Sequence, residues 1–179
     1  MSVPSKRIVV DASIARSAGP ETSKHPTSRR CREFLIAFRN AEHLIVWSDA
    51  IGDEWKRHRS GFARKWLVEM YARKRVLRIA EVEDENLRNK LKLAANNDSE
   101  REALLKDAIL VEAAIATDNR IASLDETVRK LLHHVAHSHA PLKAIVWINP
   151  DREDEDSTKW LQSGAPVDKH RLLGANLIV

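Results

Sequence analysis

Residues 7–13 read RIVVDAS, and this stretch decides the fold class. Three β-branched apolar residues in a row, Ile8 to Val10, are typical of a short strand buried on both faces. Asp11 follows the strand directly, where a carboxylate needs either a turn to cap or a cation to bind. The segments farther along the chain indicate which of these two roles to expect for Asp11.

Those segments alternate between strand and helix patterns. Short apolar runs predict further strands at residues 44–47, 120–124 and 143–148, with a short edge strand at 75–79. Apolar residues at helical spacing predict helices after residue 48 and around residues 31–41, 62–71, 87–95, 99–115 and 128–135. Because parallel neighbours need crossover connections, the alternation predicts a three-layer α/β/α sandwich with a central, mainly parallel sheet.

Length and composition bound the class of protein. A chain of 179 residues is long enough for one domain with a sizeable core. Its single cysteine, Cys31, permits no internal disulfide and favours a reducing compartment. The first apolar run is too short for a signal peptide or a membrane span, so we expect a cytoplasmic protein without a membrane partner.

Segments without regular periodicity flank this pattern. Residues 18–28 have the composition of a loop, and the tail after Pro150 predicts a short helix around Trp160 and Leu161. No glycine-rich turn follows the first strand, which argues against a dinucleotide-binding enzyme.

The net charge of +4 is unevenly distributed along the chain. An acidic run occupies residues 151–156, whereas residues 56–78 are strongly basic. Such a cluster is either a patch for nucleic acid or an ordinary solvated helix face. The candidate nucleic-acid-binding residues are Lys56, Arg57, Arg59, Arg64 and Lys65.

Four acids are predicted to meet at one edge of the sheet. Asp11 and Asp125 each follow a strand, and ligands collect at the carboxyl ends of parallel strands. Glu54 lies beside the apolar stripe of the helix after residue 48, and Asp107 lies on the apolar stripe of residues 99–115. Both should therefore point inward.

Each acid also has a structural alternative. Asp11 and Asp125 can cap the turn or helix that follows them. Glu54 can be a surface acid among basic neighbours, and Asp107 can pair with a basic residue of its own helix. Asp49 is expected to cap the helix after residue 48, and Asp118 to be a turn residue at the opposite edge of the sheet.

Together, the four carboxylates would repel one another unless a cation lies between them. The candidate site contains oxygen ligands and neither histidine nor cysteine, which favours Mg²⁺ or Mn²⁺. A pair at His133 and His137 has the spacing of zinc ligands, but no third ligand of suitable spacing is evident.

The order of these motifs resembles the PIN domain family, including VapC-like toxins. The likeness rests on Asp11 with Ser13, on Ser48 six residues before Glu54, and on two further segments. These are Asp107-Ala-Ile-Leu-Val-Glu-Ala-Ala114 and Ser123-Leu-Asp125. The resemblance covers residues 1–150, which would form a PIN-like nuclease domain, and leaves residues 151–179 as a C-terminal extension packed on or flanking it.

The resemblance implies a metal-dependent endoribonuclease that hydrolyses RNA phosphodiester bonds, with DNA as a second possible substrate. It assigns the catalytic and metal-ligating roles to Asp11, Glu54, Asp107 and Asp125, and supporting roles to Ser13 and Ser123. A divalent ion can activate water for in-line attack on phosphorus, so no side-chain nucleophile is needed. The likeness further implies a toxin role with an antitoxin-like partner, and a homodimer.

A second function remains open from the sequence. The same fold can be a catalytically silent module that binds RNA or a protein. Trp47, Trp55, Trp66 and Trp147 fall in apolar patterns and are expected in the core rather than as platforms for bases.

Overall fold

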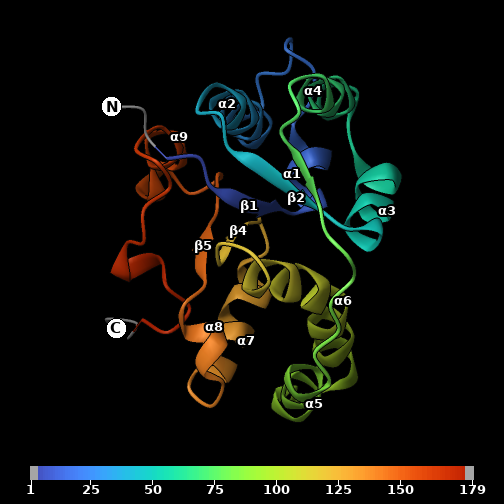
Figure 1. The fold of residues 1–179 in the computed structure, drawn as a ribbon, viewed down its shortest axis with the longest axis vertical. Helices are drawn as coiled ribbons and strands as arrows, with labels where there is room; N and C mark the ends of the chain where they lie inside the picture. The colour runs from blue at the N-terminus through green and yellow to red at the C-terminus, as the bar shows by residue number, and fades with distance from the viewer. Residues whose placement is uncertain (1–3, 176–179) are drawn as a thin grey trace.

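The protein is a five-stranded sheet between two layers of helices, as seen in a computed structural model that describes residues 4–175 (Figure 1). The strands are β1 (Arg7–Val10), β2 (Leu44–Trp47), β3 (Val76–Arg78), β4 (Arg120–Ala122) and β5 (Val146–Ile148). Every pairing between them is parallel, in the order β3-β2-β1-β4-β5. The predicted three-layer α/β/α sandwich is therefore confirmed.

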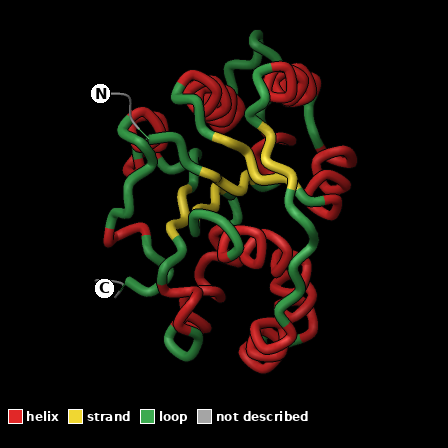
Figure 2. Tube along the Cα trace, viewed as in Figure 1, coloured by secondary structure: helices red, strands yellow, loops and turns green. Residues whose placement is uncertain are grey.

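Helices cover both faces of the sheet (Figures 1 and 2). One layer holds α1 (Ala12–Ser17), α2 (Pro26–Asn40), α3 (Asp49–His58), α4 (Gly61–Ala72) and α9 (Ser157–Gln162). The other holds α5 (Glu85–Ala94), α6 (Asp98–Ile115), α7 (Glu126–Ala136) and α8 (Ala140–Lys143). Two single 3₁₀ turns, Glu153–Glu155 and Lys169–Arg171, lie in the tail. Among these helices, none is long and apolar enough to cross a bilayer.

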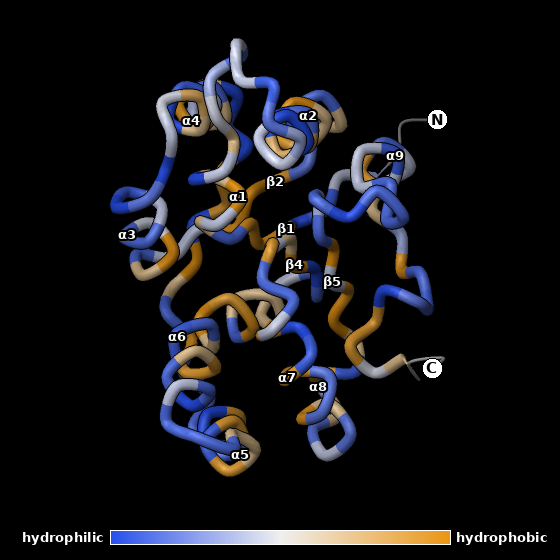
Figure 3. The backbone as a smooth tube through the Cα atoms, turned by 180° about the vertical axis from the view of Figure 1, so that it is seen from behind, coloured by the Kyte–Doolittle hydropathy of each residue, from blue (hydrophilic) through white to orange (hydrophobic). Residues whose placement is uncertain are grey.

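The central strands are buried on both faces, whereas the edge strand β3 is partly exposed. Ile8, Val9 and Val10 have no exposed surface, and the central strands carry the apolar colour in Figure 3. Because helices cover both faces, the strands read as continuous apolar runs rather than as alternating patterns. The expected core tryptophans are confirmed as buried: Trp47, Trp55, Trp66 and Trp147.

The chain changes direction across the sheet between β1 and β4. From β1 it moves through β2 to β3 at one edge, and then α5 and α6 carry it back to β4 on the other side of β1. Val10 pairs with Ala122, so these two strands end side by side. Open parallel sheets bind ligands at this type of switch point.

Several helix ends differ from the sequence prediction. A short helix, α1, was not predicted, and α2 begins at Pro26, inside the expected loop. Ser48 rather than Asp49 caps α3, because its hydroxyl accepts from the Ile51 amide. Neighbouring short polar residues compete for a cap position, and the sequence pattern alone does not rank them.

The start of α6 lies one residue before the helix predicted at residues 99–115. Asn97 caps it, because its side chain accepts from the Glu100 amide at 2.9 Å. Asp118 is more than a turn residue, because its carboxylate accepts from the Arg7 backbone amide at 2.8 Å and pairs with the Arg7 guanidinium. It thereby fixes the start of β1.

Residues 151–175 pack against the same core as the rest of the chain. Helix α9 lies beside α2, and its residues Trp160 and Leu161 are buried. The Leu161 carbonyl lies 2.9 Å from Nε2 of the fully buried His43, and Nδ1 of that ring accepts from the Lys6 amide. Burial lowers the pKa of His43, which keeps the ring neutral and suited to this bridge.

The histidine pair has structural partners. His133 Nδ1 lies 2.7 Å from the Leu173 carbonyl, and His137 Nδ1 lies 3.0 Å from the His133 carbonyl. These bonds engage only Nδ1 of each ring, as is also common in metal-bound histidines, but no third His, Cys, Asp or Glu converges with the pair among residues 4–175.

A buried ion pair joins α5 to α6. Glu112 is only 3% exposed, and its two carboxylate oxygens accept from Arg88 at 2.8 and 2.9 Å. One of them also accepts from the Asp84 amide at 2.9 Å. Removing one partner of a buried pair leaves the other charge uncompensated.

We therefore expect Glu112→Gln to lower the free energy of unfolding by about 2 kcal/mol, since Arg88 would keep only a neutral acceptor. Chemical denaturation measures this. The control is Glu83→Gln, which removes a largely exposed acid 3.7 Å from the same arginine and should cost less than about 0.5 kcal/mol. Equal costs for the two variants would contradict the role given to Glu112.

Candidate functional site

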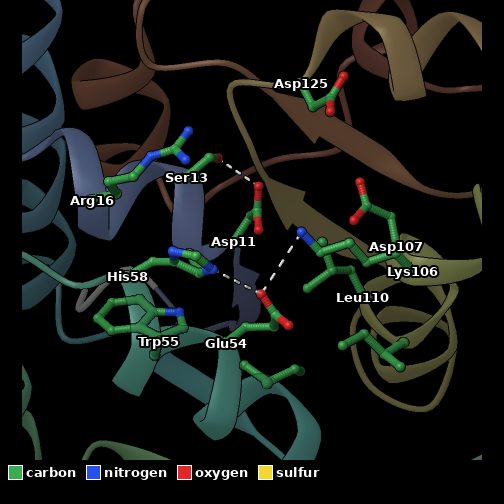
Figure 4. Close-up of a pocket in the computed structure, with 13 residues that line it drawn as sticks. Asp11, Ser13, Arg16, Glu54, Trp55, His58, Lys106, Asp107, Leu110 and Asp125 are labelled. Carbon is green, nitrogen blue, oxygen red and sulfur yellow. Dashed lines mark hydrogen bonds and ion pairs between the residues drawn. The ribbon is translucent and has the colours of Figure 1, made fainter. Parts of the chain in front are cut away.

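The four predicted acids line one pocket at the carboxyl edge of the sheet (Figure 4). It is a cavity of about 160 Å³ beside the ends of β1 and β4. Its lining residues are Asp11, Ala12, Ser13, Arg16, Ile51, Glu54, Trp55, His58, Lys106, Asp107, Ile109, Leu110 and Asp125. The acids come from four separate elements, so tertiary structure brings them together.

Asp11 is held in place by both of its neighbouring strands and turns. Its backbone amide donates to the Ala122 carbonyl at 2.9 Å, which continues the ladder between β1 and β4. Its carboxylate Oδ2 accepts from Ser123 Oγ at 2.8 Å and from Ser13 Oγ. Two hydroxyl donors on one oxygen fix the rotamer and leave the other carboxylate oxygen facing the pocket.

The two serines also fix the turn that carries Asp125. Ser13 Oγ accepts from the Leu124 amide at 3.2 Å, and Ser123 Oγ accepts from the Asp125 amide at 3.1 Å. Asp125 Oδ1 caps α7 by accepting from the Val128 amide at 2.8 Å. Asp125 therefore does cap α7, as its structural alternative predicted. The cap is compatible with a site role because it uses only one carboxylate oxygen.

Asp107 is the acid with the least compensation. It projects from α6 into the pocket and has no hydrogen bond or ion pair with any described residue. Burial raises its pKa to about 7, with further increases from the charges of Asp11 and Asp125. Lys106 lowers that pKa and Glu54 raises it, each by a smaller amount. A cation in the pocket would restore the ionised form.

The structural alternative for Asp107, pairing with a basic residue of its own helix, does not form. Arg101 instead pairs with Asp98 at 2.6 Å, and the Lys106 ammonium reaches across the pocket to Glu54 at 3.8 Å. The side chain of Asp107 is thus left facing the other carboxylates.

Glu54 has a different electrostatic setting from the other three acids. Its carboxylate contacts Arg57 at 2.6 Å, His58 at 3.5 Å and Lys106 at 3.8 Å. It lies inward, as predicted, but its charge is offset by cations on α3 and α6. The site is therefore one compensated acid facing three acids without a cationic partner in the described part of the chain.

Three basic residues of the pocket were missed by the sequence analysis: Arg16, His58 and Lys106. His58 lies four residues after Glu54, a spacing that places both on one helix face and could have indicated it. Arg16 belongs to α1, which was not predicted as a helix, so no pattern indicated its direction. Its guanidinium forms no ion pair within residues 4–175 although four carboxylates line the same pocket.

The basic residues proposed for nucleic-acid binding divide between two helices. Lys56 and Arg57 lie exposed near the end of α3, Arg59 follows it, and Arg64 and Lys65 are exposed on α4. Arg57 is less available to nucleic acid than the other four, because its guanidinium already pairs with Glu54.

The donor atoms of the pocket are of the type that a hard divalent cation prefers. The side chains that carry them are not close enough together to hold one ion. Between residues 4 and 175, no three His, Cys, Asp or Glu side chains converge closely enough to hold one ion. The available donors are carboxylate oxygens, which Mg²⁺ and Mn²⁺ prefer, and the raised pKa of Asp107 indicates uncompensated negative charge. A change of side-chain rotamers would be needed for three of them to share an ion.

No protein-family model, curated protein or solved structure matches this chain. The resemblance to the PIN domain family therefore stays a prediction from the order and spacing of the residues.

The raised pKa of Asp107 predicts how stability depends on pH. The ordinary pKa of this group is 3.8, so the unfolded chain releases the proton at lower pH than the folded chain does. Folding stability should therefore fall as the pH rises from about 4 to about 7. Asp107→Asn removes this penalty.

We expect the Asn variant to be more stable than the wild type at pH 8 without divalent ions, by on the order of 1 kcal/mol. The difference should vanish near pH 4. Thermal melts across this range measure it, with Glu102→Gln on the exposed side of α6 as the control. A pH-independent difference would show that Asp107 does not titrate as described.

Proposed function

We propose that the chain is a metal-dependent endoribonuclease of the PIN type. The observation that carries the proposal is the pocket at the switch point, where Asp11, Asp107 and Asp125 have no cationic partner among residues 4–175 and Glu54 completes the set. Proteins keep such repelling carboxylates together where a cation is part of their function.

The chain's own residues would prepare the site. Ser13 and Ser123 orient Asp11, and the cap at the start of α7 fixes Asp125. When bound, Mg²⁺ or Mn²⁺ would supply Lewis-acid activation of water and neutralise charge at the phosphate. Asp11, Asp107 and Asp125 would hold the ion, joined by Glu54 once it leaves Lys106.

The cations around the acids support a nucleic acid as the substrate, and the choice of RNA rests on the family resemblance. Arg16 lines the pocket without an ion pair in the described chain, and Lys106 would be free to contact a phosphate once Glu54 turns to the ion. Phosphate contacts of this kind give affinity that depends on salt and little on sequence. The toxin role, an antitoxin-like partner and a homodimer rest on the family resemblance alone and stay predictions.

A catalytically silent RNA- or protein-binding module is the second candidate. It is favoured by the contacts of Glu54, whose charge is already offset by Arg57 and Lys106. In that case the cations would stand permanently in place of a metal ion, and Asp107 would stay partly protonated.

Cleavage assays separate the two candidates. We expect the wild type to cut single-stranded RNA with Mn²⁺ or Mg²⁺ and to be inactive in EDTA. Asp11→Asn should reduce the rate by at least about 100-fold, since it removes a ligand charge but keeps an acceptor for both serine hydroxyls. A matched DNA substrate tests the preference for RNA.

Glu33→Gln, a change on the exposed face of α2, should cut as fast as the wild type and serves as the control. If the wild type cuts neither RNA nor DNA with any of these ions, the enzyme is ruled out in favour of the binding module.

Ion binding can be measured without cleavage. At pH 8, Mn²⁺ should raise the melting temperature of the wild type, because the ion binds the folded pocket and removes repulsion among the acids. Asp11→Asn should lose most of this increase, whereas Glu33→Gln should retain it. An equal increase in all three proteins would indicate ion binding elsewhere on the chain.

A further inference from the structure

A second groove lies on the opposite side of α3 from the acidic pocket. Its volume is about 290 Å³, and its lining residues are Trp47, Asp49, Gly52, Asp53, Lys56, Arg59, Leu67 and Tyr71. The helical repeat places Glu54 and His58 on the face toward the acids, and Gly52 and Lys56 on the face toward this groove. One helix diameter, about 10 Å, therefore separates the two sites.

The groove contains an indole N–H without a partner. Trp47 is only 6% exposed, yet its Nε1 has no hydrogen bond to any residue that the structure describes. The corresponding nitrogens of Trp55 and Trp66 donate to backbone carbonyls at 2.8 and 2.6 Å. This nitrogen is not among the buried polar atoms that lack a partner, so it keeps contact with solvent in the groove and its N–H is available for a ligand.

Gly52 preserves the space at that nitrogen. A Cβ at position 52 would lie 2.8 Å from Trp47 Nε1, closer than ordinary packing allows. The glycine is therefore required by close approach, in the middle of a helix where alanine has the higher propensity. Its effect is to let this edge of the indole pack against the backbone of α3, with no side chain at position 52 to cover the nitrogen.

An exposed aromatic ring completes one wall. Tyr71 on α4 is 44% exposed and meets Trp47 edge to face, with ring centroids 6.5 Å apart. A partly exposed tyrosine next to an indole N–H without a partner in the described residues offers a stacking surface and a hydrogen-bond donor together. Unpaired bases are bound by this combination, because every base has a π face and an acceptor atom.

The charges at the groove fit a nucleic-acid backbone. Lys56 and Arg59 make no ion pair with any residue in the range 4–175, so both can bind phosphates. Asp49 is neutralised by Arg78 at 2.9 Å, which leaves Asp53 as an acceptor for an amino or imino group of a base.

We propose that this groove binds one unpaired nucleobase of a single-stranded RNA whose adjoining backbone passes the acidic pocket. Tyr71 stacks on the base, the Trp47 N–H donates to it, and Lys56 and Arg59 hold the neighbouring phosphates. This assignment rests on the proposed function, since it names how that site would select unpaired RNA. It also revises the expectation that Trp47 serves only the core.

The test measures RNA binding in EDTA, so that it does not depend on cleavage. A fluorescent single-stranded RNA of about 10 nucleotides is compared with a copy in which every base is absent but the backbone is intact. The wild type should bind the complete RNA about 10-fold more tightly than the abasic copy. Tyr71→Ala and Trp47→Phe should each remove most of this difference, whereas Tyr71→Phe should retain it.

Val68→Ala is the matched control, because Val68 is 64% exposed one turn earlier on α4 and lies outside the groove. Circular dichroism melts verify that each variant folds. Equal binding of the complete and abasic RNA by the wild type would overturn the proposal, as would unchanged discrimination in Tyr71→Ala.

The two proposals can fail separately. Base-dependent binding without metal-dependent cleavage would keep the groove and remove the nuclease. Cleavage without base-dependent binding would do the opposite.

Discussion

The parallel pairing of β1 with β4 is the contact on which the site depends. It continues one residue past the strand, where the Asp11 amide donates to the Ala122 carbonyl, and so places Asp11 beside Ser123 across a gap of more than a hundred residues in sequence. Because both strands are buried on both faces, neither can shift without exposing apolar surface. A rigid platform of this kind can hold a carboxylate in a position that a loop could not maintain against repulsion.

Helix α3 organises the chemistry around that platform. One face of it contributes Glu54 to the acidic pocket, and the other contributes Gly52 and Lys56 to a groove of different character. The helix is anchored by Ile51 and by Trp55, whose indole donates to the Val10 carbonyl at the end of β1. The distance between the two sites is thus fixed by the width of a single helix packed against the sheet.

Charge compensation is uneven across the molecule. Glu112 is buried and fully paired with Arg88, as expected for an acid with a structural role. Asp107 is also sheltered but has no partner in the described chain, and its pKa is raised to about 7 by burial and by its acidic neighbours. Glu112 thus has the setting of a structural ion pair, whereas Asp107 lies where a positively charged ligand can reach it.

The sequence by itself determined the fold class and the edge of the sheet at which the acids meet. Strand runs such as residues 8–10 are local signals, and the carboxyl ends of parallel strands must share an edge. Only tertiary structure decided the strand order, the contacts of Arg57, His58 and Lys106 with Glu54, and the Trp47 N–H that has no partner in the described part of the chain. These depend on which side chains of distant segments reach one point, and residue spacing within one segment carries no information about that.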